Sequence, residues 1–280
     1  FSNAGVPPVA FVQMLESQAL DPDAVARLRN IMAREGTDEA TLMQHDVQAP
    51  LRWFRDLYPD LDVDRATLLG FSFAGQAQLT SFGPLSVPLV SAGSVAEIVE
   101  LLTYLPLITT AINAQFRPND QGLTVGLWGH TGDRALDCLA VTYTGSALLR
   151  LLDMLVSDAL TVTLHLSWSA PVSLNKLAAE MVLAGRLFFD APMSYLHVPV
   201  NALNEVCRFS DPLAYRLAVA ELRRTLDEQS GATSFSKKVR RLLDEDPGQR
   251  SCQRVADELP VSTSTLKRRL AAEGTTFCAL

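Results

Sequence analysis

Cysteine is scarce in this sequence, and the few cysteines are far apart. The 280 residues contain four of them, at positions 138, 207, 252 and 278. No pair has the short spacing of a zinc site or of a redox-active motif. The sequence therefore predicts neither a cysteine-based metal centre nor a disulfide framework. Free thiols favour a reducing compartment, so we expect a cytoplasmic protein.

Long uncharged hydrophobic runs are also lacking. The most apolar stretch, residues 147–168, contains Arg150, Asp153, Asp158 and His165. A membrane-spanning helix rarely accepts so many polar groups. The N-terminus does not show the basic-then-apolar order of a secretion signal. We therefore expect no membrane partner.

Enzyme signatures are missing as well. The four histidines, at positions 45, 130, 165 and 197, are scattered, with no carboxylate or cysteine cluster at ligand spacing. The sequence thus predicts no metal and no cofactor. No glycine-rich phosphate loop follows a predicted strand, which disfavours a nucleotide-binding fold. Ser72 lies in the run GFSFAG, whose spacing does not fit a nucleophile elbow, so we expect no catalytic residue.

The charge that is present is unevenly distributed. The chain has a net charge of −7, but from Gly231 onward nine Lys/Arg face six Asp/Glu. This tail therefore has a net charge of +3, and the rest of the chain −10. An acidic body with a mildly basic tail is typical of a sensor joined to a nucleic-acid reader.

The hydrophobic pattern of the first 205 residues or so predicts an α+β fold, with helices packed on a small sheet. Residues 8–58 repeat apolar side chains at helical spacing, and Asp21-Pro22 is a helix start signal. Strict alternation predicts strands over 123–127 and 160–168. An apolar helix over 135–156 is expected between them, with apolar residues nearly all round and therefore buried. Further short strands are plausible near 186–189 and 195–199.

The rest of the chain reads as helical. Asp211-Pro212 starts a connector helix, which Gly231 is expected to end. A second helix over 235–243 would carry Lys237, Lys238, Arg240 and Arg241 outward. We therefore predict a ligand-sensing and dimerisation domain at 5–208, a connector at 209–231 and a partial, all-α DNA-binding domain at 232–280.

Residues 251–274, SCQRVADELPVSTSTLKRRLAAEG, predict two short helices joined by a tight turn. Ser251 and Ser262 are placed to cap the two helices, and Gly274 to end the second. The small residue Ala256 lies where the helices would cross. The inner faces are aliphatic, and together these features define a helix-turn-helix. Their inward residues are Val255, Ala256, Leu259, Val261, Leu266 and Leu270.

The outer face of the second helix is small, polar and basic. Ser264, Lys267, Arg268 and Ala271 share one stripe opposite the leucines, and Arg269 points sideways. Such a stripe fits a major groove, where Arg or Lys donates to guanine O6 and N7. The alternative is a solvated amphipathic hairpin with no ligand.

The run VADELPVSTSTLKRRLAAEGTTFCAL resembles the first helix-turn-helix of AraC/XylS-type transcription regulators. The family pattern is matched at Val255-Ala256, Leu259, Ser262, Thr265-Leu266, Arg268-Arg269-Leu270, Gly274, Phe277 and Leu280. The preceding part is similar to the arabinose-binding-type N-terminal domain of one branch of these regulators. That similarity lies in the helix-rich start and in Gly83-Pro84-Leu85, Ser94–Ile98 and Leu187–Pro192.

The resemblance implies roles for particular residues. Ser264, Lys267 and Arg268 would face bases of double-stranded DNA, and Thr263 or Arg269 the backbone. Pro260 stands where the family usually has glycine, so the first helix must end differently here. The family has two such units joined by a long helix, so we expect the reader to be cut off at Leu280.

The resemblance also implies a small-molecule effector pocket in the N-terminal domain and a homodimer. Candidate lining residues are four aromatic side chains and two polar anchors, although core packing is an alternative role for each. They are Phe71, Trp128, Trp168, Tyr104, Arg117 and His130. The resulting hypothesis is a ligand-responsive bacterial transcription regulator and not an enzyme. The alternatives are an α+β hydrolase or transferase, and a protein-interaction module with a basic helical hairpin.

Overall fold

The computed structural model describes residues 4–156, 161–233, 236, 239, 242–243, 251–259, 261–272 and 275–277. The chain divides into two compact units, Phe1–Ala220 and Glu221–Leu280, with the division inside a long helix. That helix is α11 (Pro212–Thr233), to which Gly231 belongs. The prediction that Gly231 ends it is wrong, because glycine within a helix costs only about 1 kcal/mol and does not by itself stop it.

Unit 1 begins with short helices, as the sequence predicts. Asp21 caps one of them by accepting a hydrogen bond from the Ala24 amide at 2.8 Å, and Gly36 follows it with a left-handed φ of 73°. The elements are β1 (Gly5–Val6), α1 (Pro8–Glu16), α2 (Pro22–Arg34), α3 (Glu39–Gln44), β2 (Ala49–Pro50), α4 (Trp53–Leu57) and α5 (Val63–Gln76).

Prolines shape the next segment. Gly83 takes a left-handed φ of 53° directly before Pro84, and the chain kinks there. The helix that begins at Val95 tightens into 3₁₀ geometry at Leu101 and continues past Pro106. The elements are the 3₁₀ helix η1 (Leu79–Leu85), α6 (Ser86–Ser91), α7 (Val95–Glu100) and the 3₁₀ helix η2 (Leu101–Leu107).

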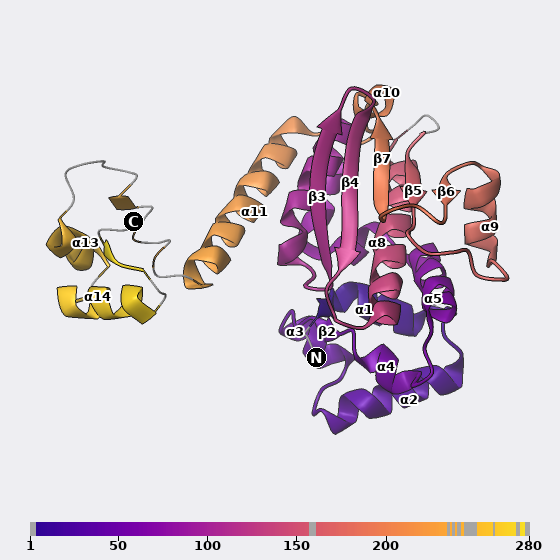
Figure 1. Cartoon of the computed structure of the whole chain (residues 1–280), viewed down its shortest axis with the longest axis horizontal. Helices are drawn as coiled ribbons and strands as arrows, with labels where there is room; N and C mark the ends of the chain where they lie inside the picture. The colour runs from indigo at the N-terminus through magenta and orange to yellow at the C-terminus, as the bar shows by residue number, and fades with distance from the viewer. Residues whose placement is uncertain are drawn as a thin grey trace. The chain divides into compact units, whose positions relative to one another are not determined.

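A five-stranded sheet follows, in the order β3-β4-β7-β5-β6. All its pairs are antiparallel except β5–β6, which confirms a mixed sheet within an α+β fold. Its strands are β3 (Ile112–Asn119), β4 (Gly122–Gly129), β5 (Thr163–His165), β6 (Leu187–Phe188) and β7 (Tyr195–Pro199), accompanied by the helices α9 (Lys176–Leu183) and α10 (Val200–Leu203). Figure 1 shows β3, β4 and β7 side by side.

One predicted strand is shorter than expected. The alternating run over 160–168 contributes only β5 to the sheet, and Leu160 lies outside the described residues. The alternation itself holds, because Val162, Leu164 and Leu166 are fully buried. The ladder stops because its partner β6 is two residues long and the chain turns at Asp190, whose φ is 58°.

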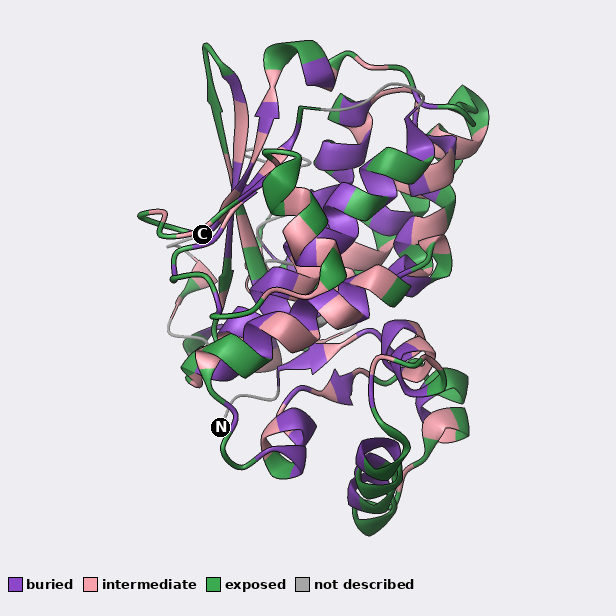
Figure 2. Cartoon of the chain, turned by 90° about the vertical axis from the view of Figure 1, so that its right-hand side faces the viewer, coloured by how far each residue is buried: buried purple, intermediate pink, exposed green. Residues whose placement is uncertain are grey.

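Helix α8 (Arg134–Leu155) is the core of unit 1. It packs against α5 and against β3, β4 and β5, and buried positions gather on the sides of the elements that face one another (Figure 2). Its mean hydropathy of 1.3 and its length would suffice to cross a membrane, but 72% of that stretch is buried inside the protein. The prediction of a helix buried nearly all round is confirmed.

Asp133, which forms an ion pair with Arg55, caps the start of α8. Asp133 accepts from the amides of Ala135 and Leu136 at 3.0 and 3.3 Å. Its two carboxylate oxygens also accept from Nε and Nη2 of Arg55 at 2.8 and 2.7 Å. The Arg55 guanidinium holds the pKa of Asp133 below its usual value of 3.8. This carboxylate therefore joins α4 to α8.

The interface between α5 and α8 depends on glycine. A Cβ built at Gly70 would lie 2.7 Å from Thr142 Cβ, whereas one built at Gly75 would have its nearest neighbour, Leu177 Cδ2, at 3.7 Å. Gly70→Ala is therefore expected to destabilise unit 1 by about 1–3 kcal/mol through overpacking. Gly75→Ala, on the same helix, should be neutral or stabilising by up to about 1 kcal/mol. Urea unfolding followed by tryptophan fluorescence measures this, because all three tryptophans lie in unit 1. Equal effects of the two variants would contradict the packing argument.

Removing the charge of Asp133 provides a pH-dependent test. Since its folded-state pKa is depressed, the stability it contributes is present above pH 3.8 and is lost as pH falls through the folded-state pKa. Asp133→Asn is expected to cost about 1–3 kcal/mol at pH 7. The difference from the unaltered protein should stay constant down to about pH 5 and shrink below pH 3.8. A difference that persists unchanged into strong acid would show that Asp133 acts through packing alone.

Candidate nucleic-acid interface and ligand cavity

The predicted helical pair is present in unit 2. Helix α13 (Cys252–Glu258) is capped by Ser251, whose Oγ accepts from the Arg254 amide at 3.3 Å. Helix α14 (Thr263–Ala272) begins after Ser262, whose Oγ accepts from the Thr265 amide at 3.2 Å. Both caps fall on the serines that the sequence predicts. Pro260 and Gly274, by contrast, lie outside the described residues.

A small aliphatic core joins the two helices. Val255 and Ala256 of α13 and Leu266 and Leu270 of α14 are fully buried, together with Val239. Residues 236, 239, 242 and 243 also have helical backbone. The partly buried residues packed around it are Leu242, Leu243, Cys252, Leu259, Val261 and Phe277. Lys237, Lys238, Arg240 and Arg241, which the sequence predicts on a helix over 235–243, are not among the described residues.

The other side of α14 is exposed. Ser264, Lys267, Arg268 and Arg269 are exposed to solvent, and Thr263 is half-buried. Leu266 and Leu270 fix the helix rotation, since their burial forces positions 264, 267, 268 and 271 outward. The structure therefore brings the five predicted DNA-contacting side chains together on one short helix. Their contact with DNA remains a prediction.

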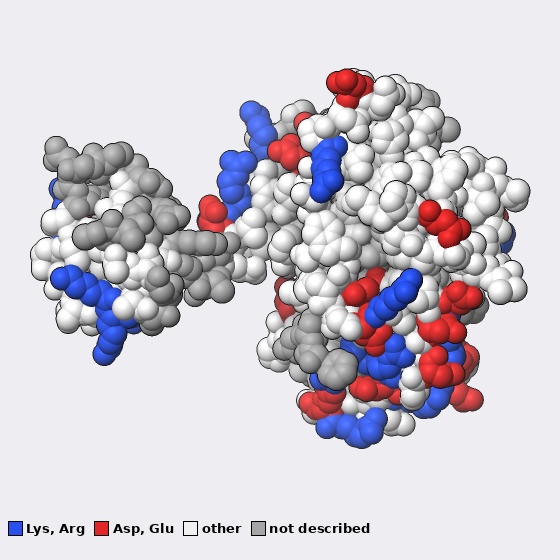
Figure 3. Space-filling model, viewed as in Figure 1, with Lys and Arg blue, Asp and Glu red and all other residues white. Residues whose placement is uncertain are grey.

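The charge of this surface is positive. Residues 263–272 contain three cationic side chains and no acidic one, and the charged side chains coloured on the visible face of the α13–α14 part are blue (Figure 3). On α13, Asp257 is partly engaged, because its Oδ1 accepts from Gln253 Nε2 at 2.9 Å. A polyanion approaching α14 would thus meet cations and serine or threonine hydroxyls.

The six predicted effector contacts do not form one site. Phe71 and Tyr104 are buried in the core, and Trp168 donates its Nε1 hydrogen to Thr67 Oγ1 at 2.8 Å. Arg117, Trp128 and His130 are exposed on or beside the β3–β4 hairpin. Core aromatics and exposed hairpin residues belong to different layers, and a cavity in unit 1 is lined by none of the six. Their contact with an effector remains a prediction.

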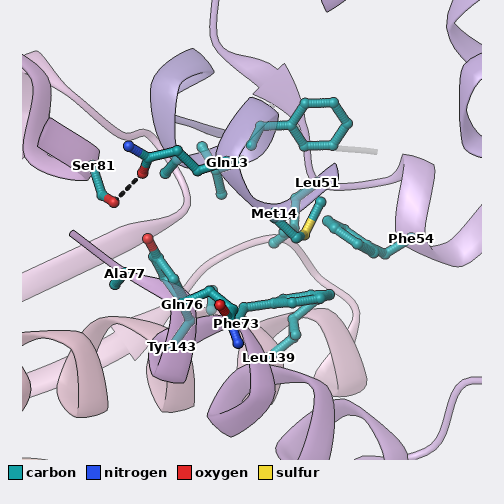
Figure 4. A pocket seen from close by; sticks show the side chains of 14 residues that line it. Gln13, Met14, Leu51, Phe54, Phe73, Gln76, Ala77, Ser81, Leu139 and Tyr143 are labelled. Atoms are coloured by element: carbon teal, nitrogen blue, oxygen red, sulfur yellow. Dashed lines mark hydrogen bonds between the residues drawn. The ribbon is translucent and has the colours of Figure 1, made fainter. Parts of the chain in front are cut away.

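That cavity lies between α1, α5 and α8. It has a volume of about 40 Å³, and its side chains point inward from all three helices (Figure 4). Most of the lining is apolar, and no lining residue is charged. The residues are Val6, Ala10, Phe11, Gln13, Met14, Leu51, Phe54, Phe73, Gln76, Ala77, Ser81, Leu139, Ala140 and Tyr143. The sequence does contain a signal for it, the glutamine and tyrosine on otherwise apolar helix faces.

The polar groups of the cavity form a cluster. Ser81 Oγ donates to Gln13 Oε1 and accepts from the Gln78 amide at 2.9 Å. Gln13 Nε2 donates to Thr80 Oγ1 at 2.7 Å. The phenol of Tyr143 points toward this pair (Figure 4). Burial raises the pKa of Tyr143 to about 12, so the phenol is protonated at neutral pH.

Among the described residues, no three His, Cys, Asp or Glu side chains gather in a way that could hold an ion. His165 lies between the rings of Phe188 and Tyr195, with centroids 4.8 and 4.3 Å away. Burial, with a smaller contribution from His197, lowers the pKa of His165. The neighbours of the His165 ring are thus two aromatic rings.

Comparison with known proteins gives limited information. The chain matches no protein-family model, and no curated protein matches it. Its structure is similar to that of the transcriptional regulator CdpR from Pseudomonas aeruginosa, with a TM-score of 0.49 and 19% sequence identity. The similarity covers 92% of this chain and 81% of that chain. At these values the likeness carries no functional conclusion, and membership of the AraC/XylS family stays a prediction.

The core of the helical pair generates a prediction for unit 2. Leu266→Ala removes a fully buried side chain and is expected to cost about 2–5 kcal/mol. Helices of seven and ten residues are too short to persist without packing. Hydrogen exchange over residues 251–272 should therefore accelerate, while the tryptophan fluorescence of unit 1 stays unchanged. Ala271→Ser, at the exposed stripe, is the control and should leave exchange unaltered. Protection that survives Leu266→Ala would contradict this packing scheme.

Proposed function

We propose that this protein is a transcription regulator of the AraC/XylS type that binds double-stranded DNA through α14. The observation that supports this most is the two-sided character of α14. Leu266 and Leu270 are fully buried against α13, and Lys267 and Arg268 are exposed on the other side. The resemblance of residues 255–280 to the family's first helix-turn-helix supports the same proposal.

The dimensions of α14 suit a major groove. An α-helix with its side chains is about 10–12 Å across, and the groove is about 12 Å wide. In this proposal Lys267 and Arg268 donate to guanine O6 and N7, with Ser264 beside them. Thr263 and Arg269 contact phosphates and fix the register of the helix on the duplex.

Unit 1 serves in this proposal as the sensor. A small effector binds its cavity and shifts the population between arrangements that present the reader differently. Two copies of the chain acting together strengthen weak individual contacts through effective concentration. The protein acts in the cytoplasm without a metal or cofactor and catalyses no reaction.

Selection of oligonucleotides from a random pool, followed by titration at several salt concentrations, tests the DNA proposal. A regulator enriches a defined sequence, and its affinity for that sequence falls linearly on a log–log scale with salt. A response without sequence preference and without a salt slope would instead favour a protein-interaction module with a basic hairpin.

Two double variants distinguish contacts with bases in the major groove from a general effect of positive charge on DNA affinity. Lys267→Ala with Arg268→Ala is expected to weaken binding to the selected sequence at least about thirtyfold, because each base contact contributes about 1–3 kcal/mol. Arg216→Ala with Arg223→Ala, at exposed positions of α11, removes the same charge and is the matched control. Binding is measured by fluorescence anisotropy, and the thermal unfolding of both variants is compared. Equal losses of affinity in the two double variants would rule out the groove assignment.

A further inference from the structure

A second cavity adjoins the one between α1, α5 and α8. It also has a volume of about 40 Å³. Four residues line both cavities, namely Val6, Ser81, Ala140 and Tyr143. Ala140 and Tyr143 are three residues apart on α8 and therefore share one face of that helix. Tyr143 thus stands at the wall between the two cavities.

Each cavity alone is too small for an organic ligand of ordinary size. A bound water needs on the order of 10–15 Å³ of such volume, so each cavity has room for a few waters. A shift of the Tyr143 side chain would merge the two spaces. The second cavity is also lined by Leu105, Ile108, Ile112 and Leu148. These side chains would add apolar surface to the merged space.

The chemistry of both linings is uncharged. Neither includes an Asp, Glu, Lys, Arg or His side chain. Burying a charged ligand group without a partner costs many kcal/mol. A sugar is disfavoured for a related reason, because each of its several hydroxyls would need a partner while most of the lining is apolar.

The polar groups that do occur are placed together at the shared wall. Gln13 Nε2 has a second hydrogen beyond the one donated to Thr80 Oγ1. The protonated phenol of Tyr143 points toward the same place (Figure 4). Gln76 is exposed and marks the side of the first cavity that is open to solvent. One ligand hydroxyl or carbonyl would therefore find partners, with apolar surface on both sides of it.

We propose that the two cavities form one chamber for an uncharged, mostly apolar small molecule, whose single hydroxyl or carbonyl is held by Gln13, Ser81 and Tyr143. This rests on the proposed role of unit 1 as a sensor and names the class of its effector. Entry moves Tyr143, which lies on the central helix α8, and this couples occupancy to the packing of unit 1.

Matched series of n-alkan-1-ols and n-alkanoates, from four to ten carbons, test the proposal on the purified full chain at pH 7. L-arabinose is a third probe. Saturable binding is measured by calorimetry and by the thermal shift of the tryptophan signal. We expect hexan-1-ol to bind one site per chain at least tenfold more tightly than hexanoate. Affinity should rise about fourfold for each added methylene until the chamber is full. Preference for the alkanoates, binding of L-arabinose alone, or no saturable binding of any probe would overturn the proposal.

Variants locate the site. Tyr143→Phe keeps the ring and removes the hydroxyl, so hexan-1-ol should bind about three- to tenfold more weakly. Tyr195→Phe, in the sheet strand β7 and outside both linings, is the matched control and should bind as the unaltered protein does. Ala140→Leu, which fills both cavities, should abolish binding. Equal affinities of the two tyrosine variants would place the alcohol elsewhere. No DNA enters these measurements, so their failure leaves the DNA-binding proposal intact.

Discussion

Burial of most of α8 is the constraint on which unit 1 depends. The helix contacts α5 on one side and β3, β4 and β5 on another, its fifteen buried residues are apolar, small or hydroxyl-bearing, and its charged residues Arg134, Arg150 and Asp153 lie at exposed positions. Close approach on the α5 side requires Gly70 opposite Thr142. The sheet side requires Gly145, where a Cβ would lie 2.6 Å from Leu164 Cδ1. The helix is thus fixed in rotation and position by small residues on two of its faces.

The same constraint determines the character of the cavities. Leu139, Ala140 and Tyr143 reach them from α8, and a buried helix offers either apolar groups or neutral hydrogen-bonding groups at such positions. The ion pair of Asp133 with Arg55 lies at the start of α8, away from this buried stretch. A ligand site next to α8 is therefore uncharged because the core around it could not accept unpaired charge.

Local signals in the sequence were sufficient for much of the fold. Asp21 caps α2 as its residue type indicates, the apolar run over 135–156 becomes α8, and 195–199 forms β7. These predictions succeeded because capping and periodicity act within a few residues. The alternation of Val162, Leu164 and Leu166 correctly indicated which side chains are buried, but strand length depended on the partner β6, which no local pattern reports.

Features that depend on distant partners were missed. Strand β3 carries Asn113, Gln115, Arg117 and Pro118, which reads as a polar loop, yet it pairs along its whole length with β4. Gly122 has a φ of 141° and its Cβ would lie 2.1 Å from the Val198 carbonyl oxygen, so the hairpin needs glycine there. The cavity was missed for the same reason: Gln13, Ser81 and Tyr143 are separated by about 60 residues each in sequence and meet only in the folded protein.

The helical pair in unit 2 was predictable because its information is local. The caps at Ser251 and Ser262 and the aliphatic residues at helical spacing all lie within residues 251–270. Neither α13 nor α14 is long enough to be stable alone, so the direction in which Lys267 and Arg268 point is set by the contact of Leu266 and Leu270 with Val255 and Ala256. The basic surface and the aliphatic core are two sides of one helix. Specific recognition by that surface therefore requires the core to stay packed, since a helix free to rotate would present its cations without a fixed register.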